Sequence, residues 1–195
     1  NEAATGGRPA SDGVDTVEEL MRNTRNNPLE DLGMHLPLIC DRYEIRDDGP
    51  PGAGKFRGGA GVVKSQRYLT PGFMTHESDR HLDAPWGAFG GKPGSVGKME
   101  IYNVKDRSNV RQEYSKFSGL RTEEGDVVSY ISPSGGGFGN PLERAPAKVL
   151  DDVLDDIITL ESARDDYGVV MRKVDDGYGW AVNEQATEKL RGEMS

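Results

Sequence analysis

The chain has a single cysteine, no long apolar run and fewer basic than acidic residues. Cys40 has no second cysteine to pair with, so an internal disulfide is excluded, and a lone thiol is typical of a reducing compartment. No stretch approaches the roughly 20 apolar residues that cross a bilayer, and no apolar signal segment follows the N-terminus. These absences predict a cytoplasmic protein without a membrane partner.

The shortage of basic and apolar residues restricts the function further. The formal net charge of −9 argues against nucleic acid as a partner, because phosphates are bound by surfaces rich in Lys and Arg. Hydrophobic residues make up 34% of the chain, so we expect a thin core that needs a partner surface to bury enough apolar area.

Glycine, by contrast, is abundant and concentrated. Eighteen of the 26 glycines lie in the middle of the chain, in dense blocks at 49–61, 85–97 and 132–141 and between them. Glycine costs about 1 kcal/mol per residue in a helix but permits close backbone approach, so the blocks predict extended, polyproline-type segments. Trp86, Phe89 and Phe138 lie inside the blocks, which indicates ordered packing with Trp86 and Phe89 as anchors.

Short alternating runs predict a mainly β fold of antiparallel sheets in a barrel-like or sandwich arrangement. Turn residues separate the expected strands, which cover 37–45, 62–69, 73–77, 98–103, 110–117 and 126–132. A short helix is expected over 16–23, after a polar, structureless leader at 1–14.

The composition changes after Pro141 and predicts a small α+β tail. A helix begins at Pro146, with an apolar face around Val149 and Val153 and a solvated Asp-rich face at 151–156. The expected elements that follow are a helix capped by Thr159 and stopped by Gly168, a hairpin about Asp176-Gly177, and a helix from Asn183 to Arg191. We therefore divide the chain into a leader and linker (1–35), a glycine-rich β domain (36–143) and a helical and hairpin appendage (144–195).

Residues 49–55 have the G-x-x-x-x-G-K spacing of a phosphate-binding loop. Phe56 stands where Ser or Thr would bind Mg²⁺, and the glycines after Arg57 prevent the helix that would hold phosphate. We interpret the segment as a tight turn between strands.

A second cluster lies at 76–83, where Glu77, Asp79 and His81 would share one face of a strand. Such a face offers N and O ligands to a divalent ion, so these residues are weak metal candidates. The preferred interpretation is a hydrogen-bonded surface edge without metal, with Asp79 and Arg80 as an ion pair or loop anchor. Cys40 is expected to be a core thiol, because it lies in an alternating run with apolar residues. It is not expected to be a nucleophile, because no base lies near it in sequence.

Residues 132–140 could present backbone N–H groups as a nest for an anion. The preferred interpretation is a buried glycine segment packed under Phe138.

Taken together, these blocks resemble the hydantoinase B/oxoprolinase family. The resemblance rests on residues 37–69, 78–94, 116–146 and 149–171, in a consistent order. Family subunits are much longer, so the resemblance implies the C-terminal third of a B-type subunit, present as a fragment or a split subunit. It also implies two β-sheets in a barrel-like arrangement that run into polyproline-type segments.

The resemblance further implies a hydantoinase A-type partner that binds ATP and Mg²⁺, the N-terminal portion of the B-type subunit as a second partner, and a small-molecule substrate. Any divalent metal is implied in that N-terminal portion, and none is expected on this chain. The implied reaction phosphorylates a carbonyl oxygen and hydrolyses a cyclic amide, such as a hydantoin, 5-oxoproline or a lactam. The alternatives are a ketone carboxylase of the acetone or acetophenone type and a non-catalytic assembly module. The isolated chain is expected to be inactive.

No catalytic residue can be assigned from the resemblance. The candidates for a pocket or interface are Lys55, Arg57, Asp79, Arg80, Trp86, Gly135, Gly136 and Gly137.

Overall fold

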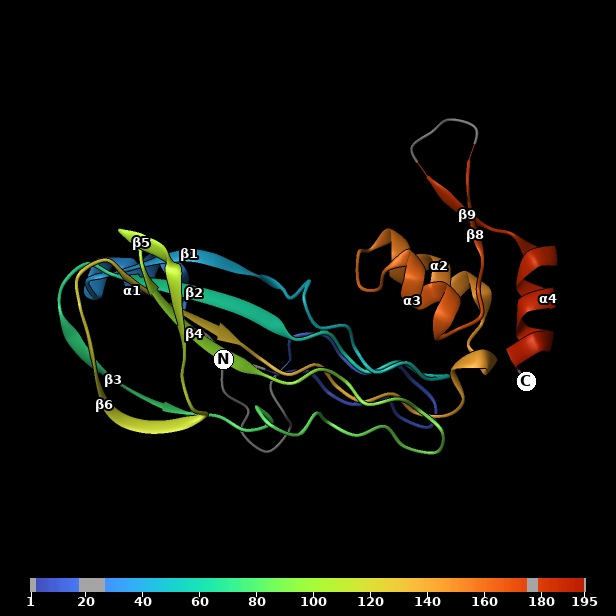
Figure 1. Cartoon of the computed structure of the whole chain (residues 1–195), viewed down its shortest axis with the longest axis horizontal. Coiled ribbons are helices and arrows are strands. Elements are labelled where there is room, and N and C mark those ends of the chain that lie inside the picture. Colours follow the sequence, from blue (N-terminus) through green and yellow to red (C-terminus); the bar gives the residue numbers. More distant parts are fainter. Residues whose placement is uncertain (1–2, 18–26, 175–178, 195) are drawn as a thin grey trace.

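Alternating apolar and polar residues form a five-stranded antiparallel sheet at one end of an elongated molecule (Figure 1). The computed structural model describes residues 3–17, 27–174 and 179–194. In spatial order the strands are β1 (Leu38–Ile45), β2 (Val62–Tyr68), β7 (Asp126–Ile131), β4 (Lys98–Asn103) and β5 (Asp106–Gln112).

A two-stranded sheet of β3 (Gly72–Glu77) and β6 (Lys116–Thr122) packs against one face of the larger sheet. The core between them contains Met74 from β3 and Met99, Ile101 and Val128 from the larger sheet. Within the described residues the sheets are layered and do not close into a barrel. The predicted mainly β, antiparallel sandwich is therefore confirmed.

One predicted strand, 110–117, is wrong in its bounds, because β5 ends at Gln112 and β6 begins at Lys116. The predicted strand runs across residues 113–115, which connect β5 to β6 and belong to neither strand. β6 instead continues through Gly119, which has a φ of 69°. The β3–β6 register shifts between Met74 and His76, so an extra residue of β6 bulges opposite β3. A glycine in the left-handed region accommodates such a bulge.

Cys40, expected in the core, is only half-buried. It lies on β1, which is an edge strand of the five-stranded sheet. Its Sγ atom lies 3.4 Å from the carbonyl oxygen of Arg42. An edge position leaves one side of the strand without a covering neighbour, so alternation alone overestimated its burial.

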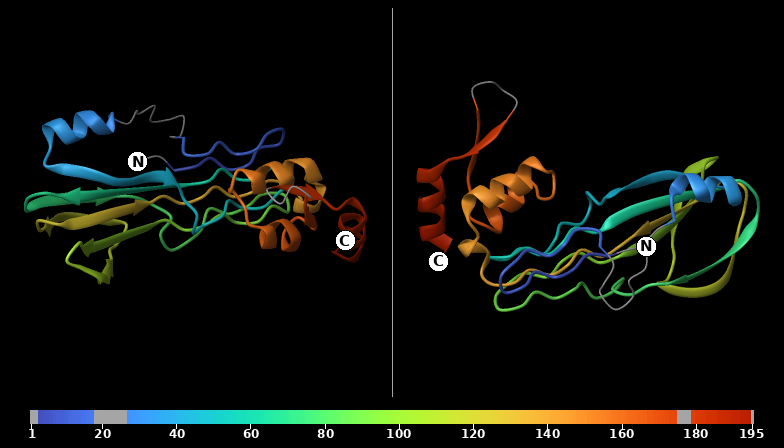
Figure 2. Two further views of the ribbon diagram at one scale, coloured as in Figure 1. Left: turned by 90° about the horizontal axis from the view of Figure 1, so that it is seen from above. Right: turned by 180° about the vertical axis from the view of Figure 1, so that it is seen from behind.

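The glycine blocks form a bundle of extended segments that leads away from the sheets (Figures 1 and 2). Backbone hydrogen bonds join the segments, including Gly59 N to Thr5 O at 2.8 Å and Gly137 N to Lys92 O at 2.9 Å. The bundle consists of residues 4–16, 49–61, 85–97 and 132–140. The prediction of ordered, extended glycine segments is confirmed.

Two expectations for this region are wrong. The residues of the predicted structureless leader that the structure describes belong to the bundle, where Gly13 N donates to Arg57 O at 2.7 Å. Residues 49–55 are not a tight turn between strands but part of a long excursion of 49–61 into the bundle, whose ends meet where Arg46 N donates to Gly61 O at 3.0 Å. Main-chain pairing between distant glycine segments explains both differences, and it leaves no local sequence signal.

The far end of the molecule is helical (Figure 1). Pro146 begins a helix as predicted, the Thr159 hydroxyl accepts from Ser162 N at 3.1 Å, and Gly168 has a φ of 62°. The elements are the 3₁₀ turn η1 (Pro141–Glu143), α2 (Pro146–Leu154), α3 (Leu160–Asp165), β8 (Met171–Lys173), β9 (Trp180–Val182) and α4 (Glu184–Met194). The turn predicted at Asp176-Gly177 lies outside the described residues.

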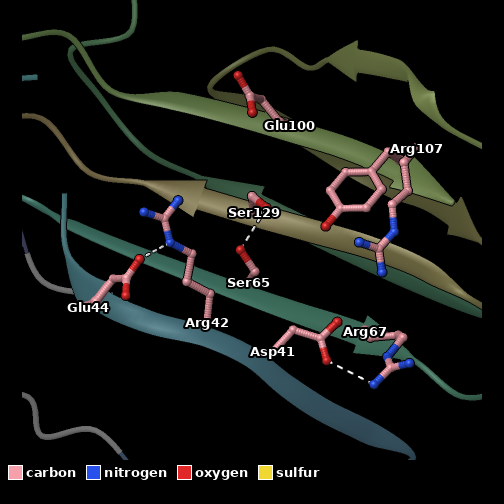
Figure 3. A pocket seen from close by; sticks show the side chains of 9 residues that line it. Asp41, Arg42, Glu44, Ser65, Arg67, Glu100, Arg107 and Ser129 are labelled. Atoms are coloured by element: carbon pink, nitrogen blue, oxygen red, sulfur yellow. Dashed lines mark hydrogen bonds and ion pairs between the residues drawn. The ribbon is translucent and has the colours of Figure 1, made fainter. Parts of the chain in front are cut away.

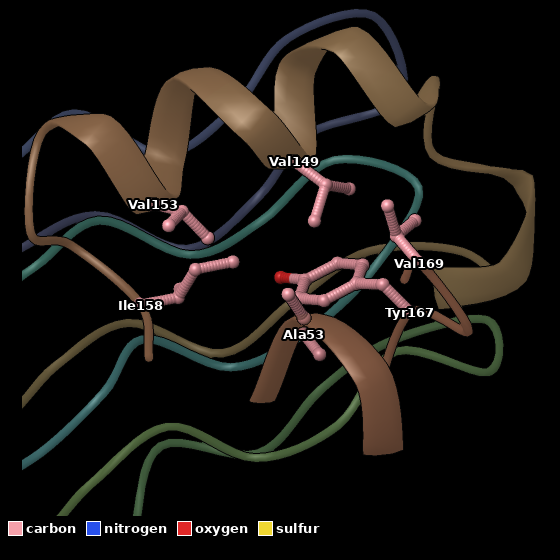
Figure 4. Packing of buried hydrophobic residues seen from close by; sticks show 7 residues of the cluster. Ala53, Val149, Val153, Ile158, Tyr167 and Val169 are labelled. Atoms are coloured by element: carbon pink, nitrogen blue, oxygen red, sulfur yellow. The ribbon is translucent and has the colours of Figure 1, made fainter. Parts of the chain in front are cut away.

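A second core joins the helices to the glycine bundle (Figure 4). Val149 and Val153 of α2 pack with Tyr167 and Val169 around Ala53, which belongs to the glycine block at 49–61. The tail therefore shares its core with the bundle. The predicted solvated Asp face is wrong at Asp152, which is only 5% exposed.

The helix α1 (Leu29–His35) was not predicted from the sequence. Pro28 is its N-cap residue, so the missing N–H of the proline removes no hydrogen bond from the helix interior. The helix expected over 16–23 falls mostly on residues outside the described ranges. None of the helices that the structure describes is both long and apolar enough to traverse a bilayer.

Candidate functional site

The candidate site lies in the segment that follows β3 and returns to the glycine bundle. It borders a depression of about 430 Å³ on the surface. The predicted candidates Asp79 and Arg80 line this depression together with His81, Leu82, Asp83 and Ser115. The structure therefore brings part of the predicted cluster to one hollow.

Two histidines connect the depression to the core between the sheets. The ring of His76 lies 6.1 Å from that of His81 and 5.4 Å from that of Tyr130, measured between centroids. Nε2 of His76 is buried and has no hydrogen-bond partner among the described residues. Burial, together with the neighbouring His81, lowers the pKa of His76 below 6.5, and burial also lowers the pKa of His81. Both imidazoles are therefore neutral near pH 7.

His81 also contacts a hydroxyl. Its Nε2 lies 3.0 Å from Oγ of Ser78. This distance is typical of a serine nucleophile that is activated by a histidine base. In such pairs a third group orients the histidine ring. Among the described residues, no side chain or carbonyl hydrogen-bonds to the other ring nitrogen of His81. The pair can bind or exchange a proton, and the geometry does not make Ser78 a catalytic residue.

Arg80 and Trp86 form a cation–π stack at the surface. The guanidinium carbon of Arg80 lies 4.8 Å from the centroid of the Trp86 ring. Arg80 has a φ of 62°, an uncommon conformation for a residue with a side chain. Trp86 is 74% exposed and Phe89 is 84% exposed, so the prediction that they anchor internal packing is wrong. The Phe89 ring touches that of Phe138, with 4.9 Å between centroids, but most of its surface and that of Trp86 remain exposed.

The weak metal candidates do not converge on one point. The Asp79 carboxylate accepts from Lys116 Nζ at 2.8 Å, while His81 faces Ser78. Within the described ranges, no three His, Cys, Asp or Glu side chains are placed to hold a metal ion.

Gly135, Gly136 and Gly137 lie inside the bundle. A Cβ at Gly136 would lie 2.0 Å from the carbonyl oxygen of Trp86, and one at Gly137 would lie 2.1 Å from that of Ala53. The N–H groups of Gly135 and Gly137 donate to the carbonyls of Gly59 and Lys92. These amides are thus already paired within the chain, which favours the buried segment over the anion nest.

Lys55 and Arg57 have different surroundings. Lys55 is exposed and its Nζ lies 2.9 Å from Oε2 of Glu143. Arg57 is buried, donating from Nε to Asp152 at 2.8 Å and from Nη1 to Asp15 at 2.8 Å. Neither residue lines the depression that Arg80 borders.

Arg57 belongs to a buried ion network that was not predicted from the sequence. Asp152 accepts from Arg57 through one oxygen and from Arg144 through the other, and Arg144 also binds Asp12. The network joins the N-terminal segment, the glycine block at 49–61 and α2. Its members are far apart in sequence, so no local pattern would reveal it.

A second depression, also not predicted, lies on the open face of the five-stranded sheet (Figure 3). Its volume is about 540 Å³. A row of Arg42, Ser65, Ser129 and Glu100 crosses four neighbouring strands in register. The sequence signal for this row is the polar residue at alternate positions of each strand. The order of the strands in the sheet, which the sequence does not give, brings these residues together.

Comparison with known proteins assigns the chain to a family. Residues 2–141 match the family described as Hydantoinase B/oxoprolinase. The chain is 41% identical over 191 residues to the B-type subunit of a putative D-/L-hydantoinase from Pseudomonas sp. strain NS671, a match that covers 97% of this chain and 31% of that protein. The chain belongs to the hydantoinase B/oxoprolinase family. The family resemblance seen in the sequence is thereby confirmed.

Other members of the hydantoinase B/oxoprolinase family are more distant. The beta subunit of the caprolactamase of Pseudomonas jessenii is 30% identical over 165 residues, covering 84% of this chain and 27% of that protein. The alpha subunit of the acetone carboxylase of Xanthobacter autotrophicus is 27% identical over 209 residues, covering 86% of this chain and 26% of that protein. The chain thus spans less than a third of the length of these relatives.

Two solved structures share the fold of this hydantoinase B/oxoprolinase chain. A nucleotide-free acetone carboxylase matches with a TM-score of 0.82 and 21% identity, over 98% of this chain and 29% of that one. The ATP-dependent caprolactamase of Pseudomonas jessenii matches with a TM-score of 0.78 and 24% identity, over 97% of this chain and 32% of that one. The arrangement of sheets, bundle and helices is therefore one that larger proteins contain.

Proposed function

We propose that this chain forms part of the B-type subunit of an ATP-dependent complex that opens a cyclic amide. The observation that carries the proposal is the 41% identity, along nearly the whole chain, to the B-type subunit of a putative hydantoinase. The substrate would be a hydantoin, 5-oxoproline or a lactam. The likeness to a caprolactamase subunit supports this class, because caprolactam is a cyclic amide.

In the proposed reaction, an A-type subunit supplies ATP and Mg²⁺. Phosphate transfer to the amide oxygen gives a phosphorylated imidate, and water attacks its carbon to form a tetrahedral adduct. Collapse of this adduct breaks the ring C–N bond, releases the nitrogen as an amine and leaves an acyl phosphate. A second water hydrolyses the acyl phosphate to a carboxylate and phosphate. Since no three ligand side chains of the described residues converge on a metal position, we assign no catalytic metal to them.

The contribution of this chain would be positional. The glycine bundle fixes the segment from His76 to Trp86 between the sheets and the helical end, and backbone contacts on both sides restrict its movement. Arg80, Asp79 and His81 would then face a substrate or a partner subunit from the depression that they line. Without that partner the chain is expected to be inactive.

The test is turnover by the complex purified with its native subunits. Hydantoin, 5-oxoproline, caprolactam and the ketone acetone are supplied separately with Mg-ATP, with and without bicarbonate, and ADP and the ring-opened or carboxylated product are quantified. We expect ADP and product to appear together without bicarbonate. ATP use that requires bicarbonate and a ketone would reject the hydrolase and support a carboxylase, the alternative favoured by the acetone carboxylase relative.

A role as a non-catalytic assembly module is the other alternative. Its support is the exposure of Trp86 and Phe89, which monomeric proteins usually bury. Substitution of Arg80 by Ala within the complex separates the two roles. Lower turnover in an intact complex favours the positional role, whereas loss of the complex itself favours the assembly role.

A further inference from the structure

The open face of the five-stranded sheet carries both charge signs in its depression. Two ion pairs are internal, Arg42 with Glu44 and Arg67 with Asp41, the second at 2.9 Å. The remaining two charged residues of the lining are Glu100 on β4 and Arg107 on β5. The side chain of neither residue forms a hydrogen bond or ion pair with the described residues. Within that part of the chain, one free anion and one free cation therefore border the same hollow.

The floor of this depression is polar and buried. Oγ of Ser65 and Oγ of Ser129 lie 2.8 Å apart, and the two residues are only 5% and 7% exposed. Since one hydroxyl donates to the other, the second hydroxyl hydrogen remains for another acceptor. Nε of Arg67, in the same lining, is buried and has no partner among the described residues.

A buried donor without an acceptor is costly and calls for an explanation, such as a bound acceptor. Here Nε of Arg67 is such a donor, and the serine pair offers a further hydroxyl hydrogen in the same depression of about 540 Å³. That volume lies within the range of small-molecule sites. Figure 3 shows Arg107 extending over the sheet towards the side of Arg67. Glu100 lies on the side of Ser129 that faces away from Ser65.

We propose that this depression binds a small zwitterion that carries one carboxylate and one ammonium group. The carboxylate accepts from Arg107, from Nε of Arg67 and from the spare serine hydroxyl. The ammonium group pairs with Glu100. The ligand thus satisfies both unpaired charges, Nε of Arg67 and the spare hydroxyl hydrogen of the site.

The balance of charges excludes simpler ligands. The lining contains three carboxylates, Asp41, Glu44 and Glu100, which repel a plain anion, and three guanidinium groups, which repel a metal ion. An amino acid is neutral overall and matches a lining whose charges sum to zero. Opening a lactam produces a molecule of this class, so under the proposed function the depression would recognise the product.

The test is isothermal titration calorimetry of the purified protein without ATP. Three probes of increasing length are glycine, 4-aminobutyrate and 6-aminohexanoate, and the singly charged controls are butyrate and butylamine. At least one amino acid should bind roughly fivefold or more tightly than either control, as expected for charge-assisted hydrogen bonds at both ends. Because no turnover is measured, this result is independent of the proposed reaction.

Two variants assign the ends of the ligand. Arg107→Ala should reduce affinity for the amino acid about fivefold or more and leave butylamine binding unchanged. Glu100→Gln should reduce affinity for the amino acid similarly and leave butyrate binding unchanged. Arg121→Ala is the matched control, since Arg121 is exposed on β6 and pairs with Glu123.

Several results would overturn the proposal. These are no heat above that of the control ligands, equal affinity for singly and doubly charged probes, or Arg107→Ala and Glu100→Gln proteins that bind like the parent. The proposal would also be overturned if Arg121→Ala weakened binding of the amino acid as much as Arg107→Ala does. The effect would then come from surface charge in general.

Discussion

Asp12 and Arg144 form a two-point ion pair across 132 positions of sequence, with Nη1–Oδ1 at 2.6 Å and Nη2–Oδ2 at 3.0 Å. The Arg144 side chain is 2% exposed. It also donates to Asp152 of α2, so one guanidinium connects the N-terminal segment to the helical end of the molecule. The network thus joins the N-terminal segment, the glycine block at 49–61 and α2.

Asp152→Ala should destabilise the fold strongly. The substitution leaves the guanidinium groups of Arg57 and Arg144 without their shared carboxylate, and breaking a buried ion pair in this way costs about 3–5 kcal/mol. The free energy of unfolding from urea titration measures the effect. Asp151→Ala on the exposed side of the same helix is the control and should change it by less than about 0.5 kcal/mol. Equal effects of the two substitutions would show that the network contributes nothing specific.

The Asp12–Arg144 pair predicts a loss of stability in acid. Burial raises the pKa of Asp12, but the hydrogen bonds and charge of Arg144 outweigh burial and hold it below 3.8. Because the folded pKa is below the unfolded one, the unfolded chain binds the proton more tightly. The contribution of the ionised Asp12 carboxylate to the free energy of unfolding is complete above about pH 4. It is lost as the pH falls through the pKa of Asp12 in the folded chain.

Urea unfolding of the parent and of Asp12→Asn at pH 5 and pH 3 tests this linkage. The parent should lose more unfolding free energy than the variant over this interval. Identical losses would mean that Asp12 does not take part in the acid response.

Gly136→Ala should disrupt the bundle. The new Cβ would lie 2.0 Å from the carbonyl oxygen of Trp86, a backbone atom that cannot rotate away, so we expect a cost of at least about 3 kcal/mol. The cost arises because the backbone at Gly136 lies too close to the backbone at Trp86 to leave room for a side chain. Gly192→Ala on α4 meets no atom within 4 Å and should leave stability unchanged or raise it by up to about 1 kcal/mol. Thermal unfolding of both variants decides whether the glycines are structural, and a Gly136→Ala protein as stable as the parent would reject close packing.

His76 predicts a second pH response, closer to neutrality. Its folded pKa lies below 6.5 because of burial and the neighbouring His81, so the folded state disfavours the protonated ring. Unfolding free energy should therefore decrease as the pH falls below about 6.5. His76→Phe retains an aromatic ring between Phe117 and Tyr130 but cannot take up the proton. Its stability should fall less than that of the parent between pH 7 and pH 5.5, and an equal fall would assign the response elsewhere.

The sequence predicted most strands because alternation is a local signal. β4 was predicted with its observed bounds, and β2, β3 and β7 within about a residue. The bulge at Gly119 was not predictable, because its favourable conformation depends on pairing with β3. Glycine density predicted extended segments correctly, but which segments pair with which is decided by backbone hydrogen bonds that any glycine can make.

The candidate site was only partly predictable. The run from His76 to Asp83 was identified by its composition, and the structure places Asp79, Arg80 and His81 on one depression. The burial of individual side chains was predicted poorly, because Trp86 is exposed while Arg57 and Asp152 are buried. Ion networks and cross-strand rows join residues that are distant in sequence, so composition and periodicity do not report them.

Trp86→Ala should affect the complex more than the chain. The side chain is largely exposed and its stack with Arg80 is worth about 0.5–1 kcal/mol, so the isolated chain should lose no more than that. If the ring contacts a partner subunit, the assembled fraction in size-exclusion chromatography should fall. Unchanged assembly and turnover would remove Trp86 from the candidate interface.

The central claim is tested most directly by native mass spectrometry of the protein purified from its source, with the intact mass of every component. We predict an assembly in which this 21.3 kDa chain, alone or within a larger B-type polypeptide, occurs with an ATP-binding A-type subunit. A stable monomer that contains this chain and no ATP-binding partner would contradict the proposed function and leave only the shared family and fold.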